Sequence, residues 1–394
     1  MNSTRTTRRE FLGKSIATGV GIAAGWRAAS FGGIAYADSG NYTATVAITK
    51  GPDRSDNAFR ALQMFKKQIA AAIGNKRVII KPNFVWFPPA LCCTNVAFVE
   101  GILEFLKSIG KRDVAVAESS ATGGTMAGFD YNGYWSLTNK YPVKLMDLNQ
   151  EGFGNAQIWQ YGNMANTAQA TIRISRMYLN PNNFIISAAP MKTHNTVLVT
   201  LATKNIAMSA PVIDVGNAWN QAGNRGDKST MHGSAGPPSG SGAGYDYQVL
   251  NDNVYRMVKV YGIHPHLAVI DGYQGMEHNG PVSGTAIATP QQLAVASLDW
   301  LAADRLALTL MGTNVFVQLN TATDGYAMPF PACLNYLWQA GLGEWDDRKI
   351  HVIGDIGDMA GNSLAGNANV YNYQANDYQT AGYETSGIRT APRE

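Results

Sequence analysis

The chain has 394 residues, of which 45% are apolar and 15% are charged, a composition typical of a globular protein with one large domain or two ordinary ones. The first 37 residues hold five of the 31 Lys and Arg residues and one of the 28 Asp and Glu residues. The remaining 26 basic and 27 acidic residues give a net charge of −1, which argues against nucleic acid or an anionic membrane as a partner.

The N-terminal segment is typical of a twin-arginine export signal. Arg8 and Arg9 are adjacent and precede a mild apolar run at 16–25, which is too short to span a bilayer. Ala35 and Ala37 place small residues at the −3 and −1 positions of a cleavage site. We therefore expect residues 1–37 to be a signal peptide that is cleaved after Ala37. The mature protein is then periplasmic or otherwise extracytoplasmic, the export machinery is a partner, and no stable membrane span remains.

Short apolar runs alternate with amphipathic stretches along the rest of the chain. We predict strands at 44–48, 77–81, 113–118, 143–148, 183–189, 267–272, 292–297 and 349–355, and helices at 57–73, 95–109 and 299–311. This alternation indicates an α/β domain over 38–355, with a mostly parallel sheet and helices on both faces. Asp299 occupies the position of a helix N-cap, and Asp304 in the same helix is interpreted as structural.

Polar side chains stand where four of these strands end. Lys81 and Asn83 follow the second strand, Glu118 ends the third, and the sequence Lys192-Thr193-His194 follows the fifth. Asp271 ends the strand at 267–272. Because ligands of open α/β sheets bind beyond the carboxyl ends of the strands, we expect these groups to share one site.

A long insertion at 216–246 is rich in Gly, Ser and Pro and has no periodicity. Such a loop inside a compact domain is usually a functional lid or a disordered segment. It contains Lys228 and His232, and a histidine there either closes over a ligand or is simply exposed. Residues 356–394 are polar and are expected to form an irregular C-terminal extension.

The three cysteines, Cys92, Cys93 and Cys333, show no CxxC spacing, so no iron–sulfur cluster or structural zinc site is expected. An oxidising compartment permits one disulfide from Cys333 to either Cys92 or Cys93. The alternative is that the two adjacent cysteines are simply small buried apolar residues. The sequence does not decide between these two interpretations.

Several motifs, in this order, resemble the family called domain of unknown function 362. They are "KPNFV", "VAVAESS", "APMKTHNTVLVTLATKN", "MHG", "LAVIDGYQGMEHNGPVSG" and "ASLDWLAADRLAL", and they extend over roughly residues 43–355. The resemblance implies an α/β domain of this type but little about activity. Some relatives carry an added ferredoxin-like module, which this sequence does not contain.

We therefore expect an enzyme that acts on a small anionic substrate through a Lys and His site at the carboxyl edge of the sheet, by proton transfer, lyase or isomerase chemistry, or a redox step. His194 would be the general acid or base, and Lys204 an electrostatic or covalent partner. The expected catalytic residues are His194, Lys204, Lys192 and Glu118, and the expected substrate-binding residues are Lys81, Asn83, Asn205, His232 and Asp271.

Two other functions stay open at this point. A metal or cofactor carrier would use His194, His232 and Glu277 as candidate ligands, although the sequence names neither a metal nor a cofactor. A non-catalytic solute-binding protein would hold the same small anion without changing it.

Overall fold

The computed structural model describes residues 43–355 except 123, 160–168, 195, 215–226, 233–246, 279, 288–289 and 312–331. The predicted signal peptide, the C-terminal extension and most of the Gly-rich insertion lie outside the described residues. No helix within the described ranges is long and apolar enough to cross a membrane.

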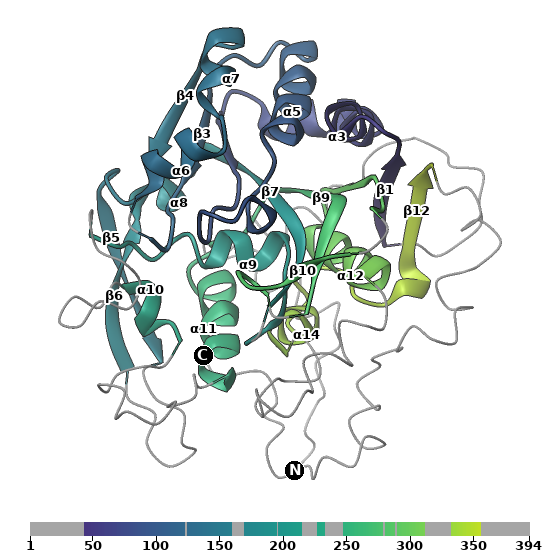
Figure 1. Ribbon diagram of the computed structural model, residues 1–394. Coiled ribbons are helices and arrows are strands. Elements are labelled where there is room, and N and C mark those ends of the chain that lie inside the picture. Colours follow the sequence, from purple (N-terminus) through teal and green to yellow (C-terminus); the bar gives the residue numbers. More distant parts are fainter. Residues whose placement is uncertain are drawn as a thin grey trace. The chain divides into compact units, whose positions relative to one another are not determined.

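The central sheet confirms the predicted α/β class (Figure 1). Its main path runs β12 (Ile350–Gly354), β1 (Ala44–Lys50), β11 (Leu293–Ser297), β9 (Leu267–Glu277), β7 (Asn183–His194), β2 (Arg77–Lys81), β3 (Val114–Glu118) and β4 (Val143–Asp147). Along this path only β11 runs antiparallel to its neighbours, so the sheet is mostly parallel, as predicted.

Two short added strands and one hairpin complete the strands of the described residues. β10 (Thr285–Ala286) pairs with β9, and β8 (Leu198–Thr200) pairs with the end of β7. β5 (Phe153–Trp159) and β6 (Gln169–Ser175) form a separate antiparallel hairpin. The short helices α8 (Arg176–Leu179) and α10 (Asp227–Thr230) both lie against β6.

Helices cover both faces of the sheet. α3 (Arg54–Gln63) and α12 (Trp300–Met311) both pack on β1 and β11. Val46 and Ile48 belong to the same hydrophobic cluster as α12, whereas Ala47, which points to the opposite face, is buried outside that cluster. The remaining helices are α4 (Lys66–Ile73), α5 (Val96–Ser108), α6 (Thr125–Tyr131), α7 (Trp135–Lys140), α9 (Ala202–Ala207), α11 (Tyr247–Lys259) and α14 (Ala332–Gln339), with 3-10 turns at Ala90–Cys92 and Asp347–Lys349.

Two sequence-based boundaries differ from the structure. The predicted helix 57–73 is two helices, α3 and α4, because Phe65 leaves helical geometry with φ −111° and ψ 18°. The predicted strand 183–189 continues to His194 as β7, because its polar end pairs with β8 (His194 with Leu198). This pairing supplies hydrogen-bond partners for backbone that would otherwise be buried without them.

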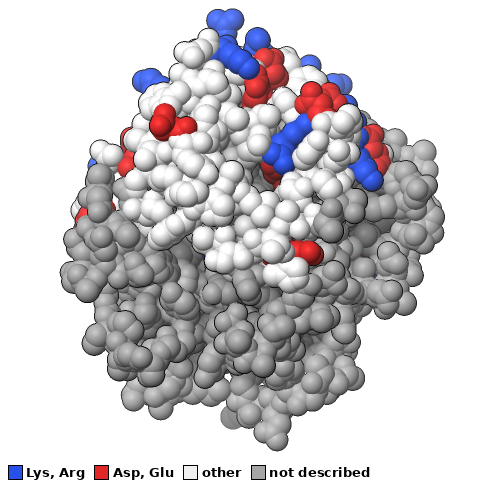
Figure 2. Space-filling view, in the orientation of Figure 1, with Lys and Arg blue, Asp and Glu red and all other residues white. Residues whose placement is uncertain are grey.

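Charges of both signs are interspersed on the face shown in Figure 2, where blue and red side chains lie close together near its upper rim. The ion pairs of the described helices include Arg60 with Asp56, Lys107 with Glu104, and Lys140 with Glu100, all exposed or half-exposed. Exposed pairs of this kind stabilise a protein only weakly.

Candidate functional site

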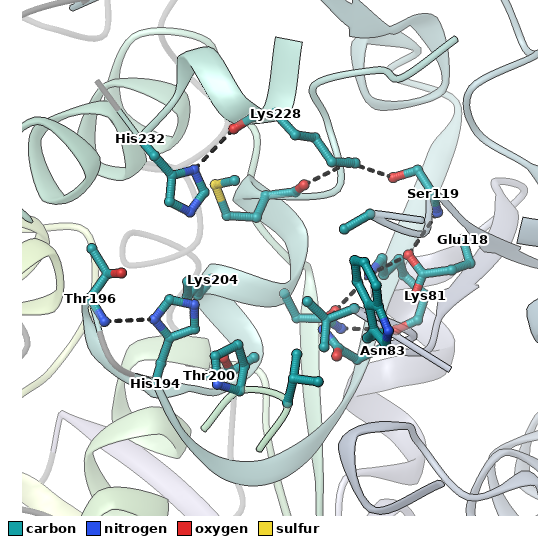
Figure 3. Close-up of a pocket in the computed structure, with 17 residues that line it drawn as sticks. Lys81, Asn83, Glu118, Ser119, His194, Thr196, Thr200, Lys204, Lys228 and His232 are labelled. Atoms are coloured by element: carbon teal, nitrogen blue, oxygen red, sulfur yellow. Dashed lines mark hydrogen bonds and ion pairs between the residues drawn. The ribbon is translucent and has the colours of Figure 1, made fainter. Parts of the chain in front are cut away.

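A cavity of about 230 Å³ lies at the carboxyl ends of β2, β3 and β7 (Figure 3). The strands are parallel, so their ends meet at one edge of the sheet. The lining residues are Lys81, Asn83, Val85, Trp86, Glu118, Ser119, Ala121, His194, Thr196, Thr200, Lys204, Asn205, Met208, Lys228, His232, Pro281 and Val282. Seven of the nine residues predicted for catalysis or substrate binding are among them, which is the convergence that the strand-end pattern indicated.

A buried ionic network forms one side of the cavity. Lys81 Nζ lies 2.7 Å from a carboxylate oxygen of Glu118, and it also donates to Asn205 Oδ1 at 2.7 Å. The other carboxylate oxygen of Glu118 accepts the backbone N–H of Phe84, and the amide of Asn83 donates to Asn205 Oδ1. Burial lowers the pKa of Lys81, and the nearby Glu118 opposes this effect. Glu118 therefore balances the charge of Lys81, and Lys81 offers no unpaired ammonium group to a ligand.

Lys192 belongs to this network but does not line the cavity. Its ammonium group donates to Asn83 Oδ1 and to the carbonyl of Cys92, each at 2.7 Å. It is fully buried, and burial lowers its pKa to about 8. The geometry places Lys192 behind Asn83, where it orients that side chain.

Lys228 enters the cavity from α10, within the Gly-rich insertion. Its ammonium group donates to Ser119 Oγ at 2.9 Å and to the carbonyls of Met208 and Pro211 at 2.8 and 2.7 Å. Three acceptors satisfy its three protons. Burial lowers the pKa of Lys228 to about 7.

The two cavity histidines are held in opposite tautomers. Nδ1 of His194 accepts the backbone N–H of Thr196 at 3.0 Å, so in the neutral ring the proton is on Nε2. Nδ1 of His232 faces the carbonyl of Lys228 at 3.0 Å, and a carbonyl only accepts, so there the proton is on Nδ1. Burial and the nearby Lys204 lower the pKa of His194 well below its usual range and that of His232 to about 3. Both rings are therefore neutral near pH 7.

Lys204 differs from the other cavity lysines because its ammonium group has no hydrogen bond or ion pair within the described part of the chain. Burial and the cations Lys192 and Lys81 lower its pKa to about 7, although the nearby Cys333 opposes them. It lies beside His194 and His232, on the side opposite Lys81 and Glu118 (Figure 3).

The backbone that carries Lys204 is fixed by a distant carboxylate. Asp304 on α12 accepts the backbone N–H groups of Ala202 and Thr203, at 2.7 and 2.9 Å. These are the first two residues of α9, and the capping bonds satisfy N–H groups that a helix leaves unpaired. Burial raises the pKa of Asp304 to about 6. Asp304 is thus structural, as expected, and the backbone that it caps is the one that carries Lys204.

One further polar group lines the cavity without a partner. The hydroxyl oxygen of Thr200 is buried and makes no hydrogen bond to the described residues. Buried polar groups in native proteins are normally hydrogen-bonded, so this hydroxyl is an unpaired donor among the described lining residues.

Two predicted residues lie elsewhere. Asp271 is inside β9, not at its end, and lies 3.5 Å from Arg54 of α3. Burial raises the pKa of Asp271, and Arg54 opposes this effect. Glu277 ends β9 and lies 3.9 Å from His278. Neither lines the cavity.

Metal ligands do not gather in the described residues: no group of three or more His, Cys, Asp or Glu side chains there is placed to hold an ion. His194 and His232 both line the cavity, but Glu277, the third candidate ligand, does not.

Sequence reasoning did not select Lys228, Ser119, Thr196 or Thr200 as site residues. Ser119 directly follows Glu118, so the strand-end rule itself extends to it. Lys228 stands one helical turn before His232, and this spacing was the available signal.

All three cysteines are free and buried, which favours the second interpretation of the sequence. Cys92 and Cys93 form an adjacent pair, and both thiols donate toward the carbonyl of Trp86. The contact with Cys93 lowers the pKa of Cys92 to about 7, whereas burial raises that of Cys333 to about 12.

Comparisons with known proteins place the chain in a family without a described activity. The sequence profile of the family described as a domain of unknown function (DUF362) matches residues 78–309, more than half of the chain. No curated protein matches. A crystal structure of a Thermotoga maritima protein, from the Northeast Structural Genomics Consortium, is similar over 66% of this chain with 13% identity and a TM-score of 0.39. The chain covers 59% of that protein's length.

Proposed function

The chain belongs to the domain of unknown function 362 family, and we propose that its cavity is the active site of an enzyme that acts on a small carboxylate. The observation that carries the proposal is a set of three groups that line the cavity without a partner in the described residues: Lys204 Nζ, the Nε2–H of His194 and the hydroxyl of Thr200. All three can donate a hydrogen bond, and the acidic side chain among the described lining residues, Glu118, is paired with Lys81. Such a set fits an oxyanion.

The other cavity charges do not compete for this anion. Lys81 is neutralised by Glu118, and Lys228 is held by three oxygen acceptors. Among the described lining residues, Lys204 is therefore the cation left for a ligand. Because Lys204 is buried, its charge is little screened and attracts an anion more strongly than an exposed lysine would.

The size and the apolar wall of the cavity favour a short molecule. A volume of about 230 Å³ is below the range of roughly 300–1,000 Å³ that holds drug-sized ligands. Val85, Trp86 and Val282 supply apolar surface beside the polar groups. A short-chain carboxylate satisfies both parts of the lining.

The chemistry follows from the states of the side chains. The neutral His194 ring offers an N–H that stabilises negative charge as it develops on a substrate oxygen. Lys204, with a pKa of about 7, exists as both ammonium and amine near neutral pH. It can thus hold the carboxylate in one form and accept a proton in the other.

Calorimetric titration with acetate, lactate, pyruvate, malonate and phosphate tests the binding. We expect at least one short carboxylate to bind, and Lys204→Met to weaken it by about 10- to 100-fold, the range for a lost charged hydrogen bond. Lys144→Met makes the same change at an exposed strand position and is expected to leave affinity unchanged. Equal affinity in wild type and Lys204→Met would refute the proposed site.

Hydrogen exchange at carbon separates an enzyme from a solute-binding protein. Each carboxylate that binds is incubated with the protein in D₂O, and NMR follows the loss of the signal of the C–H protons next to its carboxylate or, in pyruvate, next to its keto group. An enzyme that transfers protons gives exchange in wild type and much less in His194→Gln. Binding with no exchange in any ligand would favour the solute-binding alternative.

A further inference from the structure

Four buried lysines lie in or directly behind the cavity. Three of them have hydrogen-bond or ion-pair partners for their ammonium groups, and the fourth has none among the described residues. Lys81 pairs with Glu118, Lys192 donates to Asn83 and Cys92, and Lys228 donates to three oxygens. Lys204 has no such contact within the described residues. It is also the most accessible of the four, at 7% exposure against 0–3% for the others.

These contacts decide which amine is able to react. A lysine whose protons are all held by acceptors must break those bonds before its nitrogen lone pair becomes available. Burial lowers the pKa of both Lys204 and Lys228 to about 7, so acidity does not separate them. What separates them is that the ammonium group of Lys204 has no hydrogen-bond acceptor among the described residues. A buried lysine with this environment is a typical nucleophile for carbonyl carbons.

We propose that Lys204 forms an iminium (Schiff base) with the keto carbon of a short 2-oxo acid, an inference that rests on the proposed function and names its substrate class. The neutral amine attacks the carbonyl carbon, a C–N bond forms, and the amine proton moves to the former carbonyl oxygen. A second proton then expels that oxygen as water. Starting from the ammonium form, the balance is one ammonium and one carbonyl giving one iminium and one water, with no oxidant or reductant.

The neighbours of Lys204 select the 2-oxo acid. His194 Nε2–H and the Thr200 hydroxyl are donors left for the carboxylate once the lysine nitrogen is bound to carbon. In Figure 3 the imidazole of His194 lies next to Lys204 on the same side of the cavity. The apolar residues Val85 and Val282 remain for the short alkyl end. A simple aldehyde would leave both donors without an acceptor.

Reductive trapping tests the covalent step on the full chain. The protein is incubated near pH 7 with sodium cyanoborohydride and, separately, pyruvate, 2-oxobutyrate, glyoxylate and 2-oxoglutarate. We expect one adduct per chain, with the mass of the reduced iminium, and peptide mapping should place it on Lys204. Lactate, which has the carboxylate but no keto group, gives no adduct. Lys204→Arg keeps a cation but removes the nucleophilic amine, and it also gives none.

The outcomes separate the two proposals because lactate binding is measured in parallel. No adduct with any of the four acids, adducts spread over surface lysines, or an adduct on Lys228 would overturn the covalent step. If lactate still binds, and binds more weakly to the Lys204 variant, the proposed carboxylate site stands even though the iminium proposal fails. If neither lactate nor a 2-oxo acid binds, both proposals fail. Peptide mapping of the adduct uses the wild-type protein, so the covalent step can be tested even if Lys204→Arg does not fold.

Discussion

The carboxylate of Asp304 accepts the backbone N–H of Thr203 at 2.9 Å, and Thr203 immediately precedes Lys204. Asp304 also accepts the N–H of Ala202. The side chain lies on α12 and the capped backbone on α9, so a buried acid about one hundred residues away in sequence fixes the backbone that carries Lys204.

Asp304→Asn is expected to weaken this support without changing side-chain volume. An amide nitrogen cannot accept, so one of the two N–H groups loses its partner, at a cost of about 1–3 kcal/mol in unfolding free energy. Carboxylate affinity should fall along with stability. Chemical denaturation and calorimetry measure the two effects. Asp299→Asn, at the N-cap of α12 itself, is the matched control, with a similar stability loss but intact affinity.

Lys204→Met is expected to stabilise the protein at pH 6 by roughly 0.5–2 kcal/mol, because a buried ammonium without a counter-ion is costly. The folded-state pKa is about 7 against a usual 10.5. Between these values the unfolded chain binds the proton and the folded chain does not, so wild-type stability rises with pH. The free-energy cost of burying the ammonium group of Lys204 is complete below about pH 7 and disappears above pH 10.5. Denaturation at several pH values checks this; a variant that is less stable at pH 6 would contradict it.

Carboxylate affinity and iminium formation should depend on pH in opposite directions. The ammonium form of Lys204 binds the anion, so affinity for lactate falls as pH rises through about 7. The amine form attacks the carbonyl, so the rate of trapping with pyruvate rises over the same interval. Parallel pH profiles for both quantities would show that some other group controls one of them.

Glu118→Gln is expected to destabilise the protein by about 3–5 kcal/mol, because it leaves the ammonium group of Lys81 buried without its counter-charge. The double variant Lys81→Met with Glu118→Gln removes both charges and should recover part of that loss. Urea denaturation of the two single variants and the double variant gives the coupling free energy. Additive losses would mean that the pair is not coupled.

Arg173 holds the segment that carries Lys228 and His232. Its Nε donates to Asp227 of α10 at 2.7 Å, and its backbone N–H donates to the same carboxylate. Arg173→Gln is expected to raise amide hydrogen exchange over 227–232 and to weaken carboxylate binding about three- to tenfold. Arg176→Gln, at an exposed position just after the same hairpin, should change neither quantity.

We propose that residues 1–37 direct export and are then removed. Replacing Arg8 and Arg9 with Lys should retain the uncleaved precursor in the cytoplasm, because the twin-arginine pair is what the export receptor reads. Arg27→Lys is the control and should leave export intact. N-terminal sequencing of exported protein is expected to begin at Asp38. Export of the double-lysine variant at the normal level would contradict the assignment.

The sequence alone determined the strands along the main path of the sheet, but not β5, β6, β8 or β10, and it determined the edge at which those strands present polar groups. Strand β2 has the predicted bounds 77–81, and β3 begins one residue later than predicted. Continuous apolar runs and turn residues are local signals, so these elements can be read without knowing their neighbours. Parallel strands share one carboxyl edge, and this is why Lys81, Glu118 and His194 could be grouped in advance.

Tertiary structure alone decided how each of those groups is used. Lys192 is turned behind Asn83, Asp271 pairs with Arg54, and Lys228 arrives from a distant insertion, all through contacts between residues far apart in sequence. Residue type also says nothing about which histidine nitrogen keeps its proton, or which lysine is left without an acceptor. Those properties depend on where backbone carbonyls and N–H groups lie once the sheet and helices have packed.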